Sequence, residues 1–87
     1  MYYVDKSQNA DKFLEKLDAH IKERIIEKLK KLAVNSIPSD AKFITRNENG
    51  EKVFRYRIGD FRALYVVKEK ENIVLIAKID KRPRIYD

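Results

Sequence analysis

Residues 54–65, FRYRIGDFRALY, have the pattern of two β-strands joined by a tight turn. Side chains alternate between the two faces of a strand. The apolar and aromatic members of residues 54–58 are therefore predicted to face a core, whereas Arg55 and Arg57 lie side by side on the opposite face. Gly59-Asp60 is typical of a two-residue hairpin turn. The stretch thus predicts a β-hairpin with one apolar face and one basic face.

Arg62 interrupts a run, residues 61–67, that otherwise has the pattern of a buried strand. A charge in such a strand costs stability unless it is paired or used by a ligand. An ion pair with Asp60 or Asp80 is one interpretation and phosphate binding is the other. The two interpretations are compatible with each other.

Positive charge is concentrated in the second half of the chain. The net charge is +6; residues 41–87 carry twelve Lys/Arg against seven Asp/Glu, and residues 1–40 carry eight against seven. Six of the seven arginines lie in the second half. A guanidinium grips phosphate at two points, which a lysine cannot do. The composition therefore favours a polyanionic partner, with nucleic acid first.

Several classes of site are excluded or disfavoured. The chain has no cysteine, which excludes disulfides, thiol nucleophiles and Cys-based zinc sites. The only histidine, His20, is interpreted as a surface or capping residue of a helix, so neither a metal ion nor a cofactor is expected. Neither a signal peptide nor an apolar stretch of membrane-spanning length is found. We expect a cytoplasmic protein with no membrane partner.

Periodicity predicts an α+β fold. A short strand at residues 2–4 precedes two helices, which begin after the N-caps Ser7 and Asp18, and residues 36–40 end the second helix. Four strands then follow, with the last one expected at the centre of the sheet: residues 42–46, 52–58, 61–68 and 73–79. The prediction is a single domain, residues 1–87, in which a two-helix hairpin covers one face of an antiparallel meander and the basic residues occupy the other.

With these elements in place, the chain resembles the RelE/ParE superfamily of type II toxin–antitoxin toxins, and its archaeal-like RelE branch in particular. The resemblance rests on the order of elements and on residues 54–65, which look like the family segment Y-R-x-R-x-G-x-Y-R-x-x-Y. It also rests on Lys81-Arg82 followed by Tyr86. It implies a ribosome-dependent endoribonuclease (an mRNA interferase) that cuts mRNA in the A site, without a metal ion, by attack of the 2′-hydroxyl. The implied partners are a small RelB-like antitoxin, in a heterotetrameric complex, and the 70S ribosome with its mRNA.

The resemblance also implies roles for individual residues. The catalytic set surrounds the scissile phosphate: Arg62, Arg82, Tyr86, Arg55 and Arg57. Within it, Arg82 matches an arginine near the leaving oxygen, and Tyr86 matches a tyrosine that stacks on a base and is a candidate to take the proton of the 2′-hydroxyl. Further RNA-binding positions are Arg46, Lys52, Lys81 and Arg84. Many relatives carry lysines where Arg55 and Arg57 stand, so the general acid and base stay open.

Two other functions fit the same pattern. One is a ParE-like inhibitor of DNA gyrase, against which the presence of both Arg82 and Tyr86 argues. The other is a non-catalytic RNA-binding module. Arginine remains protonated and tyrosine titrates near ~10, so proton transfer is the weakest part of the nuclease hypothesis. A cationic environment would lower the pKa of the Tyr86 phenol.

Overall fold

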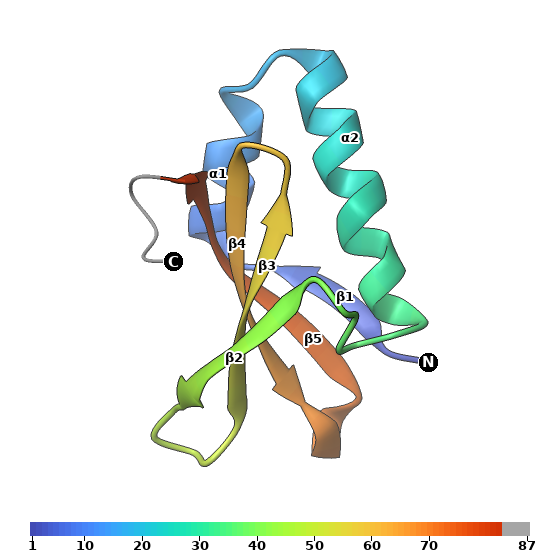
Figure 1. The fold of residues 1–87 in the computed structure, drawn as a ribbon, viewed down its shortest axis with the longest axis vertical. Helices are drawn as coiled ribbons and strands as arrows, with labels where there is room; N and C mark the ends of the chain where they lie inside the picture. Colours follow the sequence, from blue (N-terminus) through green and yellow to red (C-terminus); the bar gives the residue numbers. More distant parts are fainter. Residues whose placement is uncertain (83–87) are drawn as a thin grey trace.

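The computed structural model describes residues 1–82, in which two helices pack on one face of a five-stranded sheet (Figure 1). The elements follow in this order: β1 (Tyr3–Lys6), α1 (Gln8–Glu15), α2 (Ala19–Lys30), a 3-10 turn η1 (Lys31–Ala33), β2 (Ala41–Arg46), β3 (Lys52–Ile58), β4 (Phe61–Lys68), a 3-10 turn η2 (Glu69–Glu71) and β5 (Ile73–Lys81). This α+β arrangement confirms the fold predicted from the sequence.

The strand order in the sheet is β1-β5-β4-β3-β2. Strands β2 to β5 form the predicted antiparallel meander, and β1 pairs in parallel with β5, which makes the sheet mixed. The middle strand is β4, and β5 lies beside it rather than at the centre. A parallel partner for β5 is possible because the two helices cross over between β1 and the meander.

Both helices begin at side chains that cap their free backbone N–H groups. The Ser7 hydroxyl accepts from the amide of Ala10 at 3.1 Å, and the Asp18 carboxylate accepts from the amide of His20 at 2.9 Å. These two caps were predicted from the sequence. Neither helix within residues 1–82 is long and apolar enough to cross a membrane.

The core lies between the helices and one face of the sheet. The helices contribute aliphatic side chains at helical spacing, and β3 and β4 contribute every second residue. The buried residues of β5 are Val74, Ile76 and Ile79, because the β4–β5 register shifts between Ile76 and Lys78. The largest fully buried side chains are Tyr56, Tyr65, Leu14, Ile25, Leu32, Ile76 and Val74. Ile21, which the helical pattern places on the buried stripe, is 36% exposed, because it lies in the first turn of α2, where the helix extends past the β3–β4 turn (Figure 1).

Two core tyrosines connect the sheet to α2 and to the segment that follows it. The Tyr65 hydroxyl donates to the backbone oxygen of Ser36 at 2.6 Å, and the Tyr56 hydroxyl donates to that of Lys28 at 3.3 Å. Burial raises the pKa of the Tyr65 phenol above its ordinary value of 10, with smaller contributions from Tyr56 and Asp40. The neutral phenol is therefore the form that the folded protein stabilises.

We predict that Tyr65→Phe lowers the free energy of unfolding by about 1 to 2 kcal/mol, because the Ser36 carbonyl loses its donor. The raised folded-state pKa gives a contribution that is fully present below pH 10 and is lost as the pH rises further. Urea unfolding at pH 8 and at pH 11 measures both effects. The variant should lose less stability between the two pH values than the wild type does, and equal losses would contradict the assignment.

Candidate functional site: a cationic pocket on the open face of the sheet

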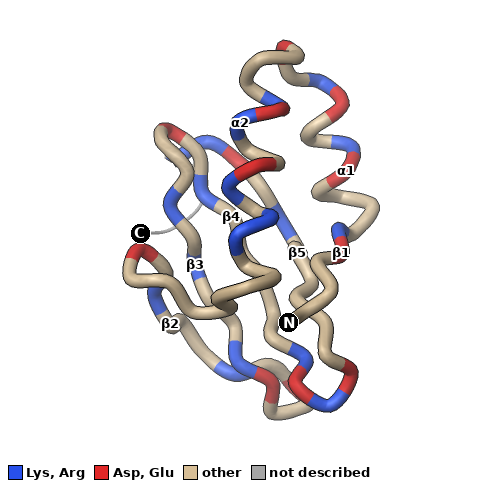
Figure 2. Tube along the Cα trace, turned by 90° about the vertical axis from the view of Figure 1, so that its right-hand side faces the viewer, with Lys and Arg blue, Asp and Glu red and all other residues tan. Residues whose placement is uncertain are grey.

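The face of the sheet away from the helices carries the predicted arginines. Arg57 pairs in register with Arg62 on β4, and Arg55 pairs with Lys42 on β2. Paired residues project from the same face of a sheet, so all four cations share one face and the core aromatics of β3 occupy the other. Figure 2 shows Lys and Arg positions recurring along β3. The predicted basic face is therefore present.

These side chains line a pocket of ≈ 330 Å³. Its lining residues are Asp40, Lys42, Arg55, Arg57, Arg62 and Arg82. Arg82 arrives from the end of β5, where its backbone N–H donates to the carbonyl of Asp60 at 2.9 Å. The β3–β4 turn thus holds the segment that carries Arg82 next to the other arginines. Four of the five residues assigned to catalysis meet in this pocket, and the fifth, Tyr86, lies outside the described residues.

Arg62 is part of the fold as well as of the pocket. It is only 5% exposed, and its Nη1 donates to the backbone oxygens of Gly59 and Phe61, both at 2.9 Å. Gly59 has φ of 58°, a left-handed conformation that glycine adopts without strain. The buried guanidinium therefore braces the turn whose geometry sets the register of β3 and β4. Arg57, by contrast, is exposed.

Two predicted RNA-binding residues lie elsewhere. Arg46 and Lys52 pair with each other at the far end of the β2–β3 hairpin, on the helix-side face of the sheet. Lys52 is five residues from Arg57 along β3, which corresponds to about 17 Å. The Arg46 guanidinium donates to the Gly50 carbonyl at 2.7 Å. These two residues therefore do not join the arginine pocket, although their role in RNA binding stays a prediction.

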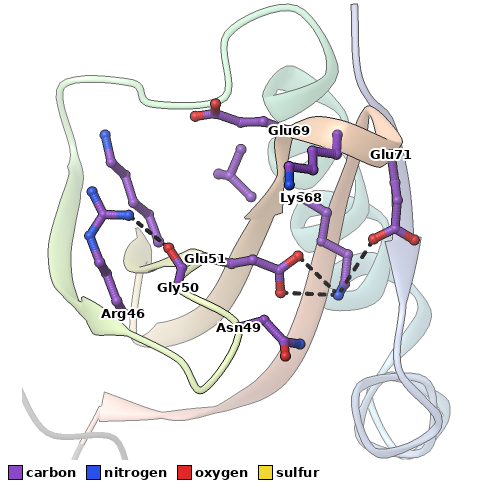
Figure 3. Close-up of a pocket in the computed structure, with 10 residues that line it drawn as sticks. Arg46, Asn49, Gly50, Glu51, Lys68, Glu69 and Glu71 are labelled. Atoms are coloured by element: carbon purple, nitrogen blue, oxygen red, sulfur yellow. Dashed lines mark hydrogen bonds and ion pairs between the residues drawn. The ribbon is translucent and has the colours of Figure 1, made fainter.

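Arg46 and Lys52 line a separate pocket that also contains acidic side chains (Figure 3). In it, the Lys68 amine lies 3.2 Å from the Glu51 carboxylate and 3.9 Å from that of Glu71. Hydrogen bonds from Asn47 first, and then from Lys68, lower the pKa of Glu51. Positive and negative charges are paired here, so this pocket attracts an anionic ligand less strongly than the arginine pocket does.

The remaining RNA-binding predictions concern the C-terminal segment. Lys81 is exposed at the end of β5 and pairs in register with Phe61, so its side chain leaves the sheet on the helix side and does not line the arginine pocket. Arg84 lies outside the described residues, as Tyr86 does. The roles of all three stay predictions.

Asp40 and Lys42 line the pocket but were not among the predicted site residues. Lys42 carries a sequence signal, since it alternates with Ala41 and Phe43 at the start of a predicted strand. Asp40 carries almost none, because it lies in a turn and reaches the pocket only through the pairing of β2 with β3. The β2–β3 register shifts between Phe43 and Thr45. Alternation counted back from Arg46 would therefore assign the side chains at the start of β2 to the wrong face of the sheet.

The pocket is suited to bind a phosphodiester and to stabilise added negative charge on it. Guanidiniums present two parallel donors to phosphate oxygens and stay charged at any physiological pH. His20 is on α2, where its amide is capped by Asp18, and takes no part. Residues 1–82 contain no group of three His, Cys, Asp or Glu side chains that could hold a metal ion. Fold and pocket together define a small α+β domain with a cationic pocket on the face of the sheet away from the helices.

Comparison with known families identifies this domain. The chain matches the family model of the ParE toxin of the type II toxin–antitoxin system parDE over residues 4–86. A Methanocaldococcus jannaschii protein named as a RelE1 toxin is 38% identical over 60 residues, which is 69% of this chain and 67% of that protein. The chain therefore belongs to the RelE/ParE superfamily of toxins, as its residues indicated.

Solved structures agree with this assignment. The toxin in the archaeal RelE–RelB complex from Pyrococcus horikoshii OT3 superposes with a TM-score of 0.82 at 25% identity, covering 97% of this chain and 98% of that one. The RelBE2 toxin–antitoxin complex from Mycobacterium tuberculosis gives 0.75 at 27% identity, covering 93% and 98%. The isolated RelE toxin of E. coli, at 21% identity and a TM-score of 0.72 over 98% and 88%, shares the fold.

The two environments of Arg62 and Arg57 give a prediction about stability. Arg62→Ala should lower the free energy of unfolding by about 2 kcal/mol, because two carbonyls of the β3–β4 turn lose a charged donor. Arg57→Ala should change it by no more than about 0.5 kcal/mol, since the side chain is exposed. Urea unfolding followed by circular dichroism compares the two variants. Equal losses would show that Arg62 does not brace the turn.

Proposed function

We propose that this chain is a RelE-like toxin that acts as a ribosome-dependent endoribonuclease, cleaving mRNA in the A site by attack of the 2′-hydroxyl on the adjacent phosphate without a metal ion. The observation that carries the proposal is the meeting of four arginines in one pocket on the open face of the sheet. Membership in the superfamily supports the toxin role. The nuclease activity is our inference from the chemistry of the pocket.

The arginines have distinct parts in this mechanism. Arg57 and Arg82 reach the pocket from exposed positions and would bind the non-bridging oxygens of the scissile phosphate. Arg62 would supply a charge held in place by the β3–β4 turn. Fixed donors aimed at the charge that develops in the transition state each contribute about 3 to 4 kcal/mol in a site that excludes water.

Dependence on the ribosome follows from what the pocket lacks. Among residues 1–82, no histidine lines the pocket and one carboxylate does, so these residues do not supply both a strong acid and a strong base. Alignment of the 2′-oxygen with the phosphorus and the leaving oxygen lowers the activation barrier by several kcal/mol. A ribosome that holds the mRNA in this in-line geometry would supply that part of the rate acceleration. Tyr86 would stack on a base of the A-site codon.

We expect purified protein, added to ribosomes programmed with a defined mRNA, to produce new 5′ ends inside the A-site codon when these are mapped by primer extension. Arg57→Ala, Arg82→Ala should cut at least about 100-fold more slowly, because two phosphate ligands are lost. These residues are chosen over Arg62 because Arg62 also supports the fold. Arg24→Ala, Lys30→Ala, which changes two exposed residues of α2, is the matched control for loss of charge and should cut at the wild-type rate.

Two outcomes of this experiment would contradict the proposal. If the mRNA stays intact with the wild-type protein, the result would favour the gyrase inhibitor or the non-catalytic RNA-binding module instead. Equal losses in the two double variants would mean that total charge, rather than the pocket, governs the activity. In a separate assay without ribosomes, efficient cleavage of naked RNA would contradict the role assigned to the ribosome.

A RelB-like antitoxin is the proposed protein partner. Solved complexes of similar toxins contain RelB. Strand β2 is an edge of the sheet, and edges of this kind accept an added strand or covering segment. Exposed large apolar side chains lie on β2 and in the loop before it: Val34, Ile37, Phe43 and Ile44. We therefore place the antitoxin over this edge.

Ile37→Ser, Ile44→Ser should weaken binding of the antitoxin at least about tenfold, because two half-exposed apolar side chains would no longer be buried in the complex. The antitoxin would be expressed from a short reading frame adjacent to this one, and titration calorimetry measures the affinity. Tyr3→Ser, at the opposite edge of the sheet, is the control. Equal weakening by both changes would argue against the β2 edge as the docking site.

A further inference from the structure

Within residues 1–82, one acidic side chain lines the arginine pocket, and the other five lining residues are cationic. Asp40 lies directly before β2 and shares the pocket with Lys42 and the four arginines. The antiparallel register pairs Ala41 with Tyr56, so the next residue back along β2, Asp40, is carried toward Arg57. A carboxylate here repels a phosphate and lowers the affinity of the pocket for anions. We therefore ask what Asp40 does that a cationic side chain at this position would not do.

A lysine from outside the pocket holds this carboxylate. The Lys28 amine, on α2, lies 2.7 Å from Oδ2 of Asp40 and 5.4 Å from the ring centroid of Tyr56. The hydrogen bond from Lys28 is the main reason why the pKa of Asp40 lies below its ordinary value. Asp40 is thus an anion at any physiological pH. Its side chain is 39% exposed, and Asp40 lines both the arginine pocket and a second pocket beside Lys28 and Tyr56, so it lies at the boundary between the two.

We propose that Asp40 is a catalytic residue of this toxin, the acceptor of the proton of the attacking 2′-hydroxyl. The inference rests on the proposed nuclease function and assigns its general base. Arginine cannot act as an acceptor. Among the lining residues that the structure describes, Asp40 has the one side chain that can accept a proton, and as a carboxylate it does so without first losing one. The role assigned to the Tyr86 phenol is then stacking alone.

The step balances as a transesterification. The 2′-oxygen forms a bond to phosphorus as its proton passes to a carboxylate oxygen of Asp40. The bond between phosphorus and the 5′-oxygen breaks, and the 5′-oxygen takes a proton from solvent water. The products are a 2′,3′-cyclic phosphate and a 5′-hydroxyl, and Asp40 returns its proton to solvent. The arginines stabilise the charge on the phosphoryl oxygens throughout.

The same carboxylate would make the site selective for RNA. A 2′-deoxyribose offers no donor to Asp40 and leaves the carboxylate facing the phosphate without a partner. Because an unpaired polar group in a binding site opposes binding, DNA and 2′-deoxy-substituted mRNA should bind less well than ribose-containing mRNA. This preference should disappear when Asp40 is replaced by asparagine, because its amide presents both donors and an acceptor.

The structural alternative is that Asp40 serves only to pair with Lys28 and so to join α2 to the start of β2. Two variants separate the alternatives. Asp40→Asn removes the anion and keeps the shape of the side chain. Lys28→Met breaks the same ion pair and leaves the carboxylate in place. Both changes remove a partly exposed pair, so both should alter stability by a similar small amount, which urea unfolding verifies.

The test measures single-turnover cleavage of A-site mRNA on programmed ribosomes from pH 6 to pH 8. We expect Asp40→Asn to slow cleavage at least about 100-fold and Lys28→Met to stay within about fivefold of the wild type. The wild-type rate should be nearly flat with pH, because Asp40 is ionised across the range. The Asp40→Asn rate should rise about tenfold per pH unit, since hydroxide must then remove the proton.

Three results would overturn the inference, and they are distinguishable. If the wild type cuts and Asp40→Asn cuts at a similar rate, the general base is another group and the nuclease function stands. If Asp40→Asn and Lys28→Met lose activity equally and keep a flat pH profile, Asp40 acts only through the ion pair. If the wild type leaves the mRNA intact, the proposed function fails and the role of Asp40 fails with it.

Discussion

The register between β3 and β4 is the constraint on which the rest of this structure depends. It is set at the two-residue turn, where Ile58 pairs with Phe61, and it carries through Arg57 and Arg62. A slip of one residue would turn every side chain of a strand to the opposite face. The aromatic residues of β3 would then lie on the open face and its arginines in the core. Burial of Tyr56 and Tyr65 against the helices makes such a slip unfavourable.

Arg62 shows how the cationic pocket and the fold support each other. A guanidinium that is 5% exposed is costly to desolvate unless its donors are satisfied. The turn satisfies two of them with the carbonyls of Gly59 and Phe61, and in return the guanidinium fixes the turn. The same turn receives the amide of Arg82 at the Asp60 carbonyl. One hairpin thereby positions two arginines that are far apart in the sequence.

Concentrating cations on one face stores electrostatic repulsion, which binding of an anion relieves. In the described part of the chain, four arginines and a lysine line the pocket, and the carboxylate of Asp40 offsets part of their charge. Lys28 binds that carboxylate from α2, in the helix layer of the domain, and its hydrogen bond lowers the pKa of Asp40 below the ordinary value. The helices therefore do more than cover the core, since a lysine of α2 binds a carboxylate at the β2 edge of the sheet.

The sequence by itself determined the elements, their approximate bounds, both helix caps and the basic face of β3, because these depend on periodicity and on contacts between near neighbours along the chain. It also singled out Arg62 as a charge in a buried strand. Only the tertiary structure decided that β1 pairs with β5 in parallel. It also decided that Arg46 and Lys52 lie near the β2–β3 turn and on the helix side of the sheet, away from the arginine pocket, whereas Asp40 lines that pocket. These outcomes depend on which strands pair and where the β2–β3 register shifts, and pairing between distant segments leaves no periodic trace in the sequence.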